Sequence, residues 1–61
     1  MRLLKEAKVS EITTFSRATI ARKVEAGEFP KPIIISARRK AWPEEAIQKW
    51  MAEVVAKSEA A

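Results

Sequence analysis

Hydrophobic and polar positions in residues 6–26 repeat with the spacing of two short helices. Val9 and Ile12 lie on one face at i, i+3 spacing, which predicts a first helix near Glu6 to Thr13. The threonine that ends this segment and the neighbouring Thr14 are poor helix formers. The pattern therefore predicts a turn directly after the first helix.

A second helix is predicted from Arg17 to about Ala26, with Ile20 and Val24 on its buried face. Ser16 precedes this helix and suits the N-cap, because its hydroxyl can accept a hydrogen bond from a free amide of the first turn. Gly27 follows the helix and suits a left-handed stop. The two helices and the turn between them predict a helix-turn-helix.

The next segment has the features of a β-hairpin. Two prolines within residues 29–32 disfavour a helix, and the β-branched run Ile33–Ile35 is the strongest strand signal in the chain. Residues 36–40 are the candidate turn, and residues 41–42 give only a very short second strand. We therefore expect a two-stranded hairpin over about residues 31–42, with a strongly basic tip.

A last helix is predicted over about residues 43–57, with Pro43 at its first position, where a missing amide costs nothing. Its apolar face repeats at i, i+3, i+4, i+7 and i+8, and it is expected to pack up to Val55. That face consists of Ile47, Trp50, Met51, Val54 and Val55. Residues 58–61 are expected to be a frayed, mobile tail. Residues 2–5 suit either a short extended segment or the lead into the first helix.

The four large aromatic residues could be stacking platforms for single-stranded nucleic acid or parts of a core. Phe15, Phe29, Trp42 and Trp50 fall at turns, strand ends and the apolar helix stripe. These are positions that a folded core uses, so the core interpretation is favoured.

Length and composition restrict the remaining possibilities. Sixty-one residues are enough for a single domain, expected over residues 1–61, with a small α+β, mostly α, fold. Because the sequence has no Cys and no His, we expect no disulfide, no transition-metal site and no cofactor. The apolar runs are too short for a membrane span, and Met1–Leu4 lacks the apolar region of a signal peptide. We therefore expect a soluble chain, compatible with a reducing cytoplasm.

The side chains give little support to catalysis. The sequence lacks His, Cys, Tyr and Asp, which leaves Glu, Lys and Ser/Thr for acid–base chemistry. Glu44 and Glu45 are adjacent on a helix and do not face one site. The single glycine rules out a glycine-rich phosphate loop. We therefore expect a protein that is not an enzyme.

Positive charge is concentrated in the middle of the chain. The net charge is +4, and residues 14–40 hold seven basic and only two acidic side chains. This segment contains the second predicted helix and the hairpin. Such a concentration favours a polyanionic partner, and a helix-turn-helix beside a basic hairpin favours double-stranded DNA.

On the second helix, Arg17, Ala18 and Arg22 occupy the first, second and sixth positions after the cap. On a helix that enters the major groove by its N-terminal end, such positions reach base edges, although they also suit an ordinary solvated face. Polar and basic neighbours add candidates for phosphate contacts. The predicted DNA-binding residues of this helix are Ser16, Arg17, Ala18, Thr19, Arg22 and Lys23.

The hairpin contributes three consecutive cations, Arg38, Arg39 and Lys40. They repel one another, so their clustering does not stabilise a hairpin tip. We expect them to contact the DNA backbone or the minor groove, as the wing of a winged helix does; a merely solubilising turn is the alternative.

Four stretches resemble the AlpA family of small phage and prophage regulators, which are related to excisionases. They are TTFSRATIA (13–21), EAGEFPKP (25–32), ARRKAW (37–42) and IQKWM (47–51). Thr14 and Ser36 stand where the family has glycine, and Ala21 stands where it often has an aromatic residue. The resemblance implies a winged-helix DNA-binding protein that activates a promoter or directs site-specific recombination toward excision.

These observations lead to the hypothesis of a sequence-specific double-stranded DNA-binding protein with a winged helix-turn-helix. It would act as an excisionase, a transcriptional regulator or both, with an integrase or RNA polymerase as partner and with cooperative self-association on DNA. No membrane partner is expected. Two alternatives are a small protein-interaction module, resembling an antirepressor, and a nonspecific RNA or single-strand binder.

Overall fold

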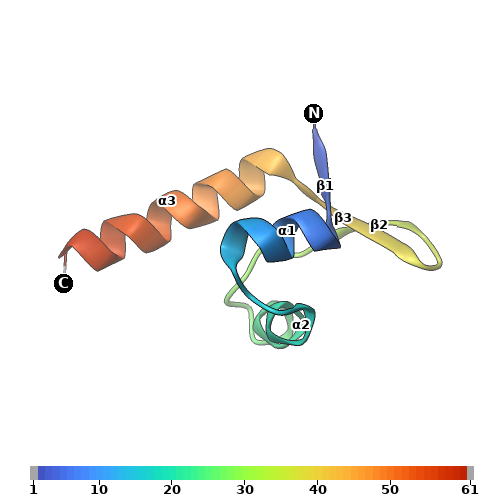
Figure 1. Cartoon of the computed structure of the whole chain (residues 1–61), viewed down its shortest axis with the longest axis horizontal. Coiled ribbons are helices and arrows are strands. Elements are labelled where there is room, and N and C mark those ends of the chain that lie inside the picture. Colours follow the sequence, from blue (N-terminus) through green and yellow to red (C-terminus); the bar gives the residue numbers. More distant parts are fainter. Residues whose placement is uncertain (1, 61) are drawn as a thin grey trace.

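A helix pair, a three-stranded antiparallel sheet and a long C-terminal helix make up the fold (Figure 1). The computed structural model describes residues 2–60, so Met1 and the last residue of the predicted tail, Ala61, lie outside the described residues. The elements are β1 (Leu3–Lys5), α1 (Glu6–Thr13), α2 (Arg17–Glu25), β2 (Ile33–Ser36), β3 (Arg39–Pro43) and α3 (Glu44–Ala60). This arrangement confirms the predicted winged helix-turn-helix.

The turn between α1 and α2 is fixed by side-chain hydrogen bonds to the backbone. The Ser10 hydroxyl donates to the Phe15 carbonyl at 2.6 Å, and the Thr13 hydroxyl donates to the Val9 carbonyl at 2.8 Å. Thr14 takes the left-handed conformation, with φ 65°. The bounds of α1 match the prediction, and the turn follows it as expected.

Both ends of α2 have the caps that the sequence predicts. The Ser16 hydroxyl accepts a hydrogen bond of 3.2 Å from the Thr19 amide. At the other end Gly27 has φ 75°, and the Glu28 amide donates to the Lys23 carbonyl at 2.9 Å. This pattern is a Schellman motif, in which the left-handed glycine ends the helix. The helix itself ends at Glu25, one residue before the predicted end.

The hairpin differs from the prediction in three ways. β1 joins it, giving the strand order β1-β3-β2 with Leu4 opposite Trp42, so residues 3–5 are extended and the sheet has three strands. The turn between β2 and β3 holds only Ala37 and Arg38, whereas the sequence predicted a turn over residues 36–40. The prediction of a very short second strand was wrong, because pairing on both sides keeps β3 extended over five residues. The hairpin of β2 and β3 is called the wing below.

The core lies where the helix pair, the sheet and the start of α3 meet. Its buried side chains are Leu4, Val9, Ile20, Phe29, Trp42 and Ile47. Phe29 makes edge-on contacts with Trp42 and Trp50, at ring-centroid distances of 6.3 and 4.8 Å, and Phe15 meets Trp50 at 5.8 Å. The aromatic residues therefore belong to the core and its edge, as predicted.

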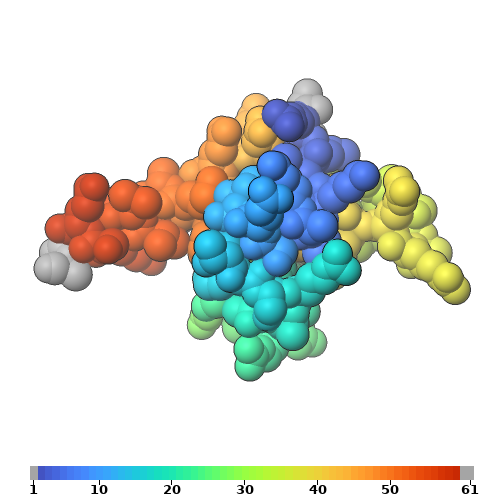
Figure 2. All heavy atoms as spheres, in the orientation of Figure 1, coloured from blue at the N-terminus to red at the C-terminus, as the bar shows by residue number. Residues whose placement is uncertain are grey.

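The C-terminal helix packs over a shorter length than the sequence predicted. Met51 is the last residue of the stripe that packs against the core, whereas Val54 and Val55 are 44% and 54% exposed. The helix α3 extends past the body of the protein, which agrees with the exposure of Val54 and Val55 (Figures 1 and 2).

Both ends of this helix also depart from the predicted bounds. Pro43 ends β3 and is not the first residue of α3, and the helix begins at Glu44, whose amide donates to the Arg2 carbonyl at 2.9 Å. The helix continues to Ala60, beyond the predicted end near Lys57, since the last residues include no proline or glycine to stop it. In the part of the chain that the structure describes, no helix has the combined length and apolar character needed to cross a membrane.

Candidate nucleic-acid interface

The outer surface of α2 carries most of the residues predicted to contact DNA. Arg17, Ala18 and Arg22 are exposed. The Ser16 hydroxyl donates to the Thr19 hydroxyl at 3.0 Å, and the Arg22 guanidinium donates to the same Thr19 oxygen at 3.3 Å. These contacts connect the side chains of Ser16, Thr19 and Arg22 along the first turns of the helix.

Lys23 lies at the boundary between this surface and the core. Its Nζ is 5.2 Å from the centre of the Phe15 ring and 3.7 Å from a Glu28 carboxylate oxygen. The side chain is 33% exposed. Its stem therefore covers the edge of the core while the charged end reaches the surface, which is ordinary behaviour for a long cationic side chain.

The three cations of the wing have different surroundings. Arg38 lies in the turn and Arg39 begins β3, and both are exposed at the tip. Lys40 instead turns toward the body: its Nζ lies 3.1 Å from a Glu6 carboxylate oxygen and 5.8 Å from the centre of the Trp42 ring. The predicted basic tip thus has two exposed arginines, whereas the lysine side chain reaches the body of the protein.

A groove of about 500 Å³ separates the wing from the start of the helix pair. Its charged lining residues are Lys5, Glu6, Arg17, Arg38, Arg39 and Lys40. All but Glu6 are basic, and together they come from β1, α1, α2 and the wing. We call this feature the wing groove. It brings Arg17 of α2 together with all three predicted wing residues, whereas Ser16, Ala18, Thr19, Arg22 and Lys23 do not line it.

Two of the charged lining residues, Lys5 and Glu6, are not among the residues that the sequence predicts for the site. An acidic residue at the start of a helix, such as Glu6, is common because it complements the helix dipole. Its partners Arg17 and Lys40 lie far along the chain and belong to other elements. Lys5 reaches the groove because β1 pairs with β3, opposite Ala41. No local sequence pattern predicts that Lys5 or Glu6 lines this groove.

The chain matches the model of one protein family, described as prophage CP4-57 regulatory protein (AlpA), over residues 2–55. That match includes the helix pair, the whole sheet and most of α3. No curated protein and no solved structure is similar enough to the chain to count as a match. Since the family match extends over nearly all of the sequence and includes every element that forms the wing groove, the chain belongs to the AlpA family of prophage regulatory proteins.

Proposed function

We propose that this protein is a regulator of a phage or other mobile element that binds double-stranded DNA in a sequence-specific manner. The observation that carries the proposal is the wing groove, where Arg17 of α2 meets the basic residues of the wing on one surface. A helix at the surface with a basic wing beside it is suited to a duplex, because the helix fits the major groove and the wing reaches the neighbouring backbone.

In this proposal the residues of α2 divide into two groups. Arg17 and Arg22 are exposed and carry guanidinium groups that can bind the O6 and N7 atoms of guanine. Ala18 lies between them in sequence and presents a small side chain, which permits close approach or contact with a thymine methyl group. The hydroxyls of Ser16 and Thr19 and the ammonium of Lys23 then contact phosphates and fix the position of the helix.

The wing supplies contacts that do not depend on sequence. Arg38 and Arg39 are exposed at its tip, and Lys40 follows them on β3 and lines the wing groove. Neighbouring cations on a hairpin suit phosphates or the minor groove. They increase the affinity for any duplex, whereas α2 provides the discrimination.

The biological output in this proposal is excision of the element, regulation of a promoter or both, in a bacterial cytoplasm at the nucleoid. The mechanism is architectural: several copies occupy neighbouring sites and guide an integrase or RNA polymerase. Exposed Val54 and Val55 on α3 support cooperative self-association, since α3 and the wing lie at opposite ends of the molecule (Figure 2). The charges also fit, because residues 41–61 carry a net −2 and the basic middle segment a net +5.

Selection from a random duplex library, followed by titration, tests DNA binding directly. The selected duplex, a random duplex and the single strands of each are titrated by fluorescence anisotropy at several salt concentrations. We expect the selected duplex to bind at least about 10³-fold more tightly than the random one. Log affinity should fall with log salt by about 0.9 for each phosphate neutralised.

Three results would contradict the proposal. If the protein binds none of the nucleic acids tested, the protein-interaction module is favoured. Preference for unpaired strands would favour the RNA or single-strand binder. A library that yields no preferred duplex would show that the protein does not read sequence. If a preferred site is found, a footprint over the DNA flanking the gene, with excision and transcription assays on that DNA, separates the two outputs.

A further inference from the structure

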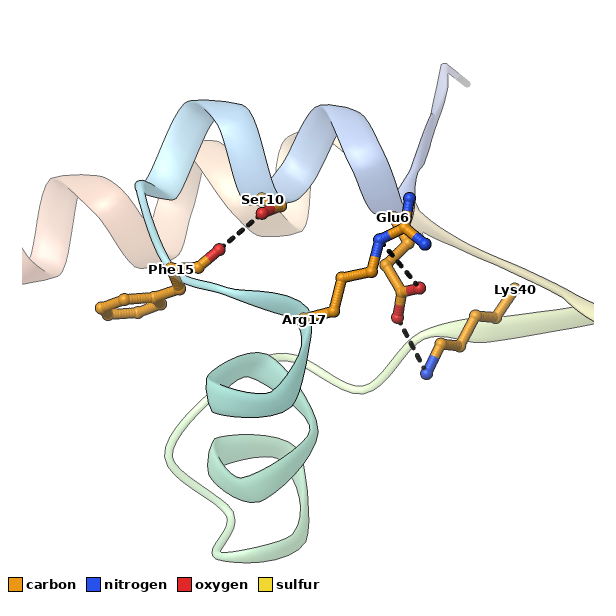
Figure 3. A network of polar contacts seen from close by, with 5 residues as sticks. All are labelled: Glu6, Ser10, Phe15, Arg17 and Lys40. Carbon is orange, nitrogen blue, oxygen red and sulfur yellow. Dashed lines mark hydrogen bonds and ion pairs between the residues drawn. The ribbon is translucent and has the colours of Figure 1, made fainter.

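One carboxylate connects α2, the proposed recognition helix, with the wing. Glu6, the first residue of α1, has Oε1 at 3.8 Å from Arg17 Nε and Oε2 at 3.1 Å from Lys40 Nζ (Figure 3). Arg17 begins α2, and Lys40 belongs to β3 of the wing. The Glu6 side chain is only 25% exposed, whereas that of Arg17 is 66% exposed. A well-held acidic group therefore lies between two cations of the proposed DNA interface.

This contact restricts the two cationic side chains before DNA arrives. Arginine and lysine each lose considerable rotamer freedom when they bind a ligand. A fixed carboxylate between them removes part of that freedom in the free protein, so less is lost on binding. The same contact sets where the guanidinium of Arg17 lies relative to the wing. Glu6 thus favours one arrangement of the Arg17 side chain and the wing over the many others.

The charge of Glu6 has a second effect, which is similar for any duplex. Phosphates contribute to the binding of preferred and random DNA alike, and a carboxylate in the wing groove repels them. This repulsion therefore lowers both affinities by similar factors. Only binding to the preferred duplex draws on base contacts, which depend on where Arg17 lies. Glu6 should therefore widen the difference between preferred and random DNA through positioning, while its charge weakens binding to both.

We propose that Glu6 is a specificity-determining positioning residue, whose carboxylate holds Arg17 and Lys40 in place across the wing groove, while its charge weakens phosphate binding there on any duplex. This inference rests on the proposed duplex binding. It assigns to Glu6 no contact with a base.

Three single variants test the inference: Glu6→Gln, Glu6→Asp and, as the matched control, Glu11→Gln. Glu11 is on the same helix, pairs with Lys8 at 3.9 Å and does not line the wing groove. Its variant therefore removes the same charge from α1 without touching the interface. Glu6→Asp keeps a carboxylate in the first turn of α1 but shortens the side chain by one methylene, so it loses reach to both partners.

Affinities for the duplex selected by the parent protein and for a random duplex are measured for every variant. Glu6→Gln should tighten random binding by about fivefold, as expected for removing one repulsive charge at a solvated surface, without the same gain on the preferred duplex. Glu6→Asp should leave random binding near the parent value and weaken preferred binding by about three- to tenfold. Glu11→Gln should change the ratio of preferred to random affinity by less than about twofold.

A double-mutant cycle separates positioning from a general effect on the fold. In an Arg17→Gln/Lys40→Gln background, Glu6→Gln should leave the preferred-to-random ratio within about twofold, because its two partners are gone. Circular dichroism and thermal unfolding show whether each variant is folded. If Glu6→Gln does not fold, the same comparison is made with Glu6→Asp, alone and in the Arg17→Gln/Lys40→Gln background.

The inference is overturned if Glu6→Gln behaves like Glu11→Gln, if Glu6→Asp keeps the parent ratio, or if the background leaves the Glu6 effect intact. The proposed function would survive each of these results. If the parent protein selects no preferred duplex, that result overturns the proposed function and, with it, this inference.

Discussion

The indole Nε1 of Trp42 donates a hydrogen bond of 2.7 Å to the carbonyl oxygen of Pro30. Trp42 is fully buried on the central strand β3, and Pro30 lies in the loop that leads from α2 to the sheet. A buried indole N–H without a partner would be costly, so this contact satisfies the indole and fixes the loop to the sheet at once. The position of α2 relative to the wing therefore depends on Trp42.

Substitution of Trp42 should lower the free energy of unfolding more than substitution of Trp50, because Trp42 is buried and Trp50 is partly exposed. Trp42→Phe leaves the Pro30 carbonyl unpaired and creates a cavity, and should cost about 2–4 kcal/mol in the free energy of unfolding. Trp50 also donates, to the Glu28 carbonyl at 3.2 Å, but it lies at the edge of the core. Trp50→Phe should cost only about 1 kcal/mol. Urea unfolding followed by circular dichroism measures both; equal costs would contradict the assignment of Trp42 as the main anchor.

Glycine should be more favourable than threonine at position 14, in the turn between α1 and α2. Thr14 is β-branched and has φ 65°, a conformation that such residues rarely adopt. Thr14→Gly should raise the free energy of unfolding by about 0.5–1 kcal/mol, because the relief of strain exceeds the added entropy of the unfolded chain. Thr13→Gly is the control and should be destabilising, since it removes two hydrogen bonds of the turn. A decrease in thermal stability in Thr14→Gly would show that the threonine is not strained.

Arg22 is the position on α2 at which a base contact can be tested with least disturbance to the fold. It is exposed, and its contact within the protein is a 3.3 Å hydrogen bond to Thr19. Arg22→Ala should cost about 1–3 kcal/mol at one base position and relax the sequence preference there. Repeating the duplex selection with the variant reveals the position. Lys57→Ala on α3 is the charge-matched control; an unchanged selected sequence for Arg22→Ala would make Arg22 a bystander.

The wing should affect affinity without affecting sequence preference. Arg38→Ala/Arg39→Ala should weaken binding to preferred and random duplexes by similar factors, and should flatten the salt dependence by about 0.9 for each phosphate that is no longer neutralised. Lys49→Ala/Lys57→Ala removes two cations from α3 and should leave the salt slope almost unchanged. Lys40→Ala should change the slope less than removal of either tip arginine, because Lys40 is already paired with Glu6. An unaltered slope in the double arginine variant would place the wing tip away from DNA.

Local chemistry explains why much of the fold could be predicted from the sequence. Ser16 and Gly27 mark the ends of α2 through their own caps, and the run Ile33–Ile35 could be assigned to a strand without knowledge of its partner. The predicted site residues on α2 follow from helical spacing alone. Whether those residues contact DNA remains a prediction, which titration of the variants with DNA tests.

The features that could not be predicted depend on distant partners. β1 is only three residues long, and it is a strand because Leu4 lies opposite Trp42. Lys40 looks like part of a basic turn until β3 is extended and Glu6 is brought beside it. Val54 continues a regular apolar stripe, yet the body of the protein ends before it. In each case the conformation or burial of the residue is set by residues elsewhere in the chain.

The pairing of the first strand with the third also bears on how the protein is made. Translation releases Leu3 well before Pro43, its partner in the sheet, so α1 and α2 leave the ribosome with no strand to hold them. Val9 and Ile20 likewise pack in the same core as Trp42 and Ile47, which are synthesised later. A basic fragment produced by early termination before Ala41 would carry the recognition helix but lack its framework, and we expect such a fragment to be digested rapidly in limited proteolysis. Non-local strand pairing in this way ties the proposed DNA binding to synthesis of the chain past Ile47.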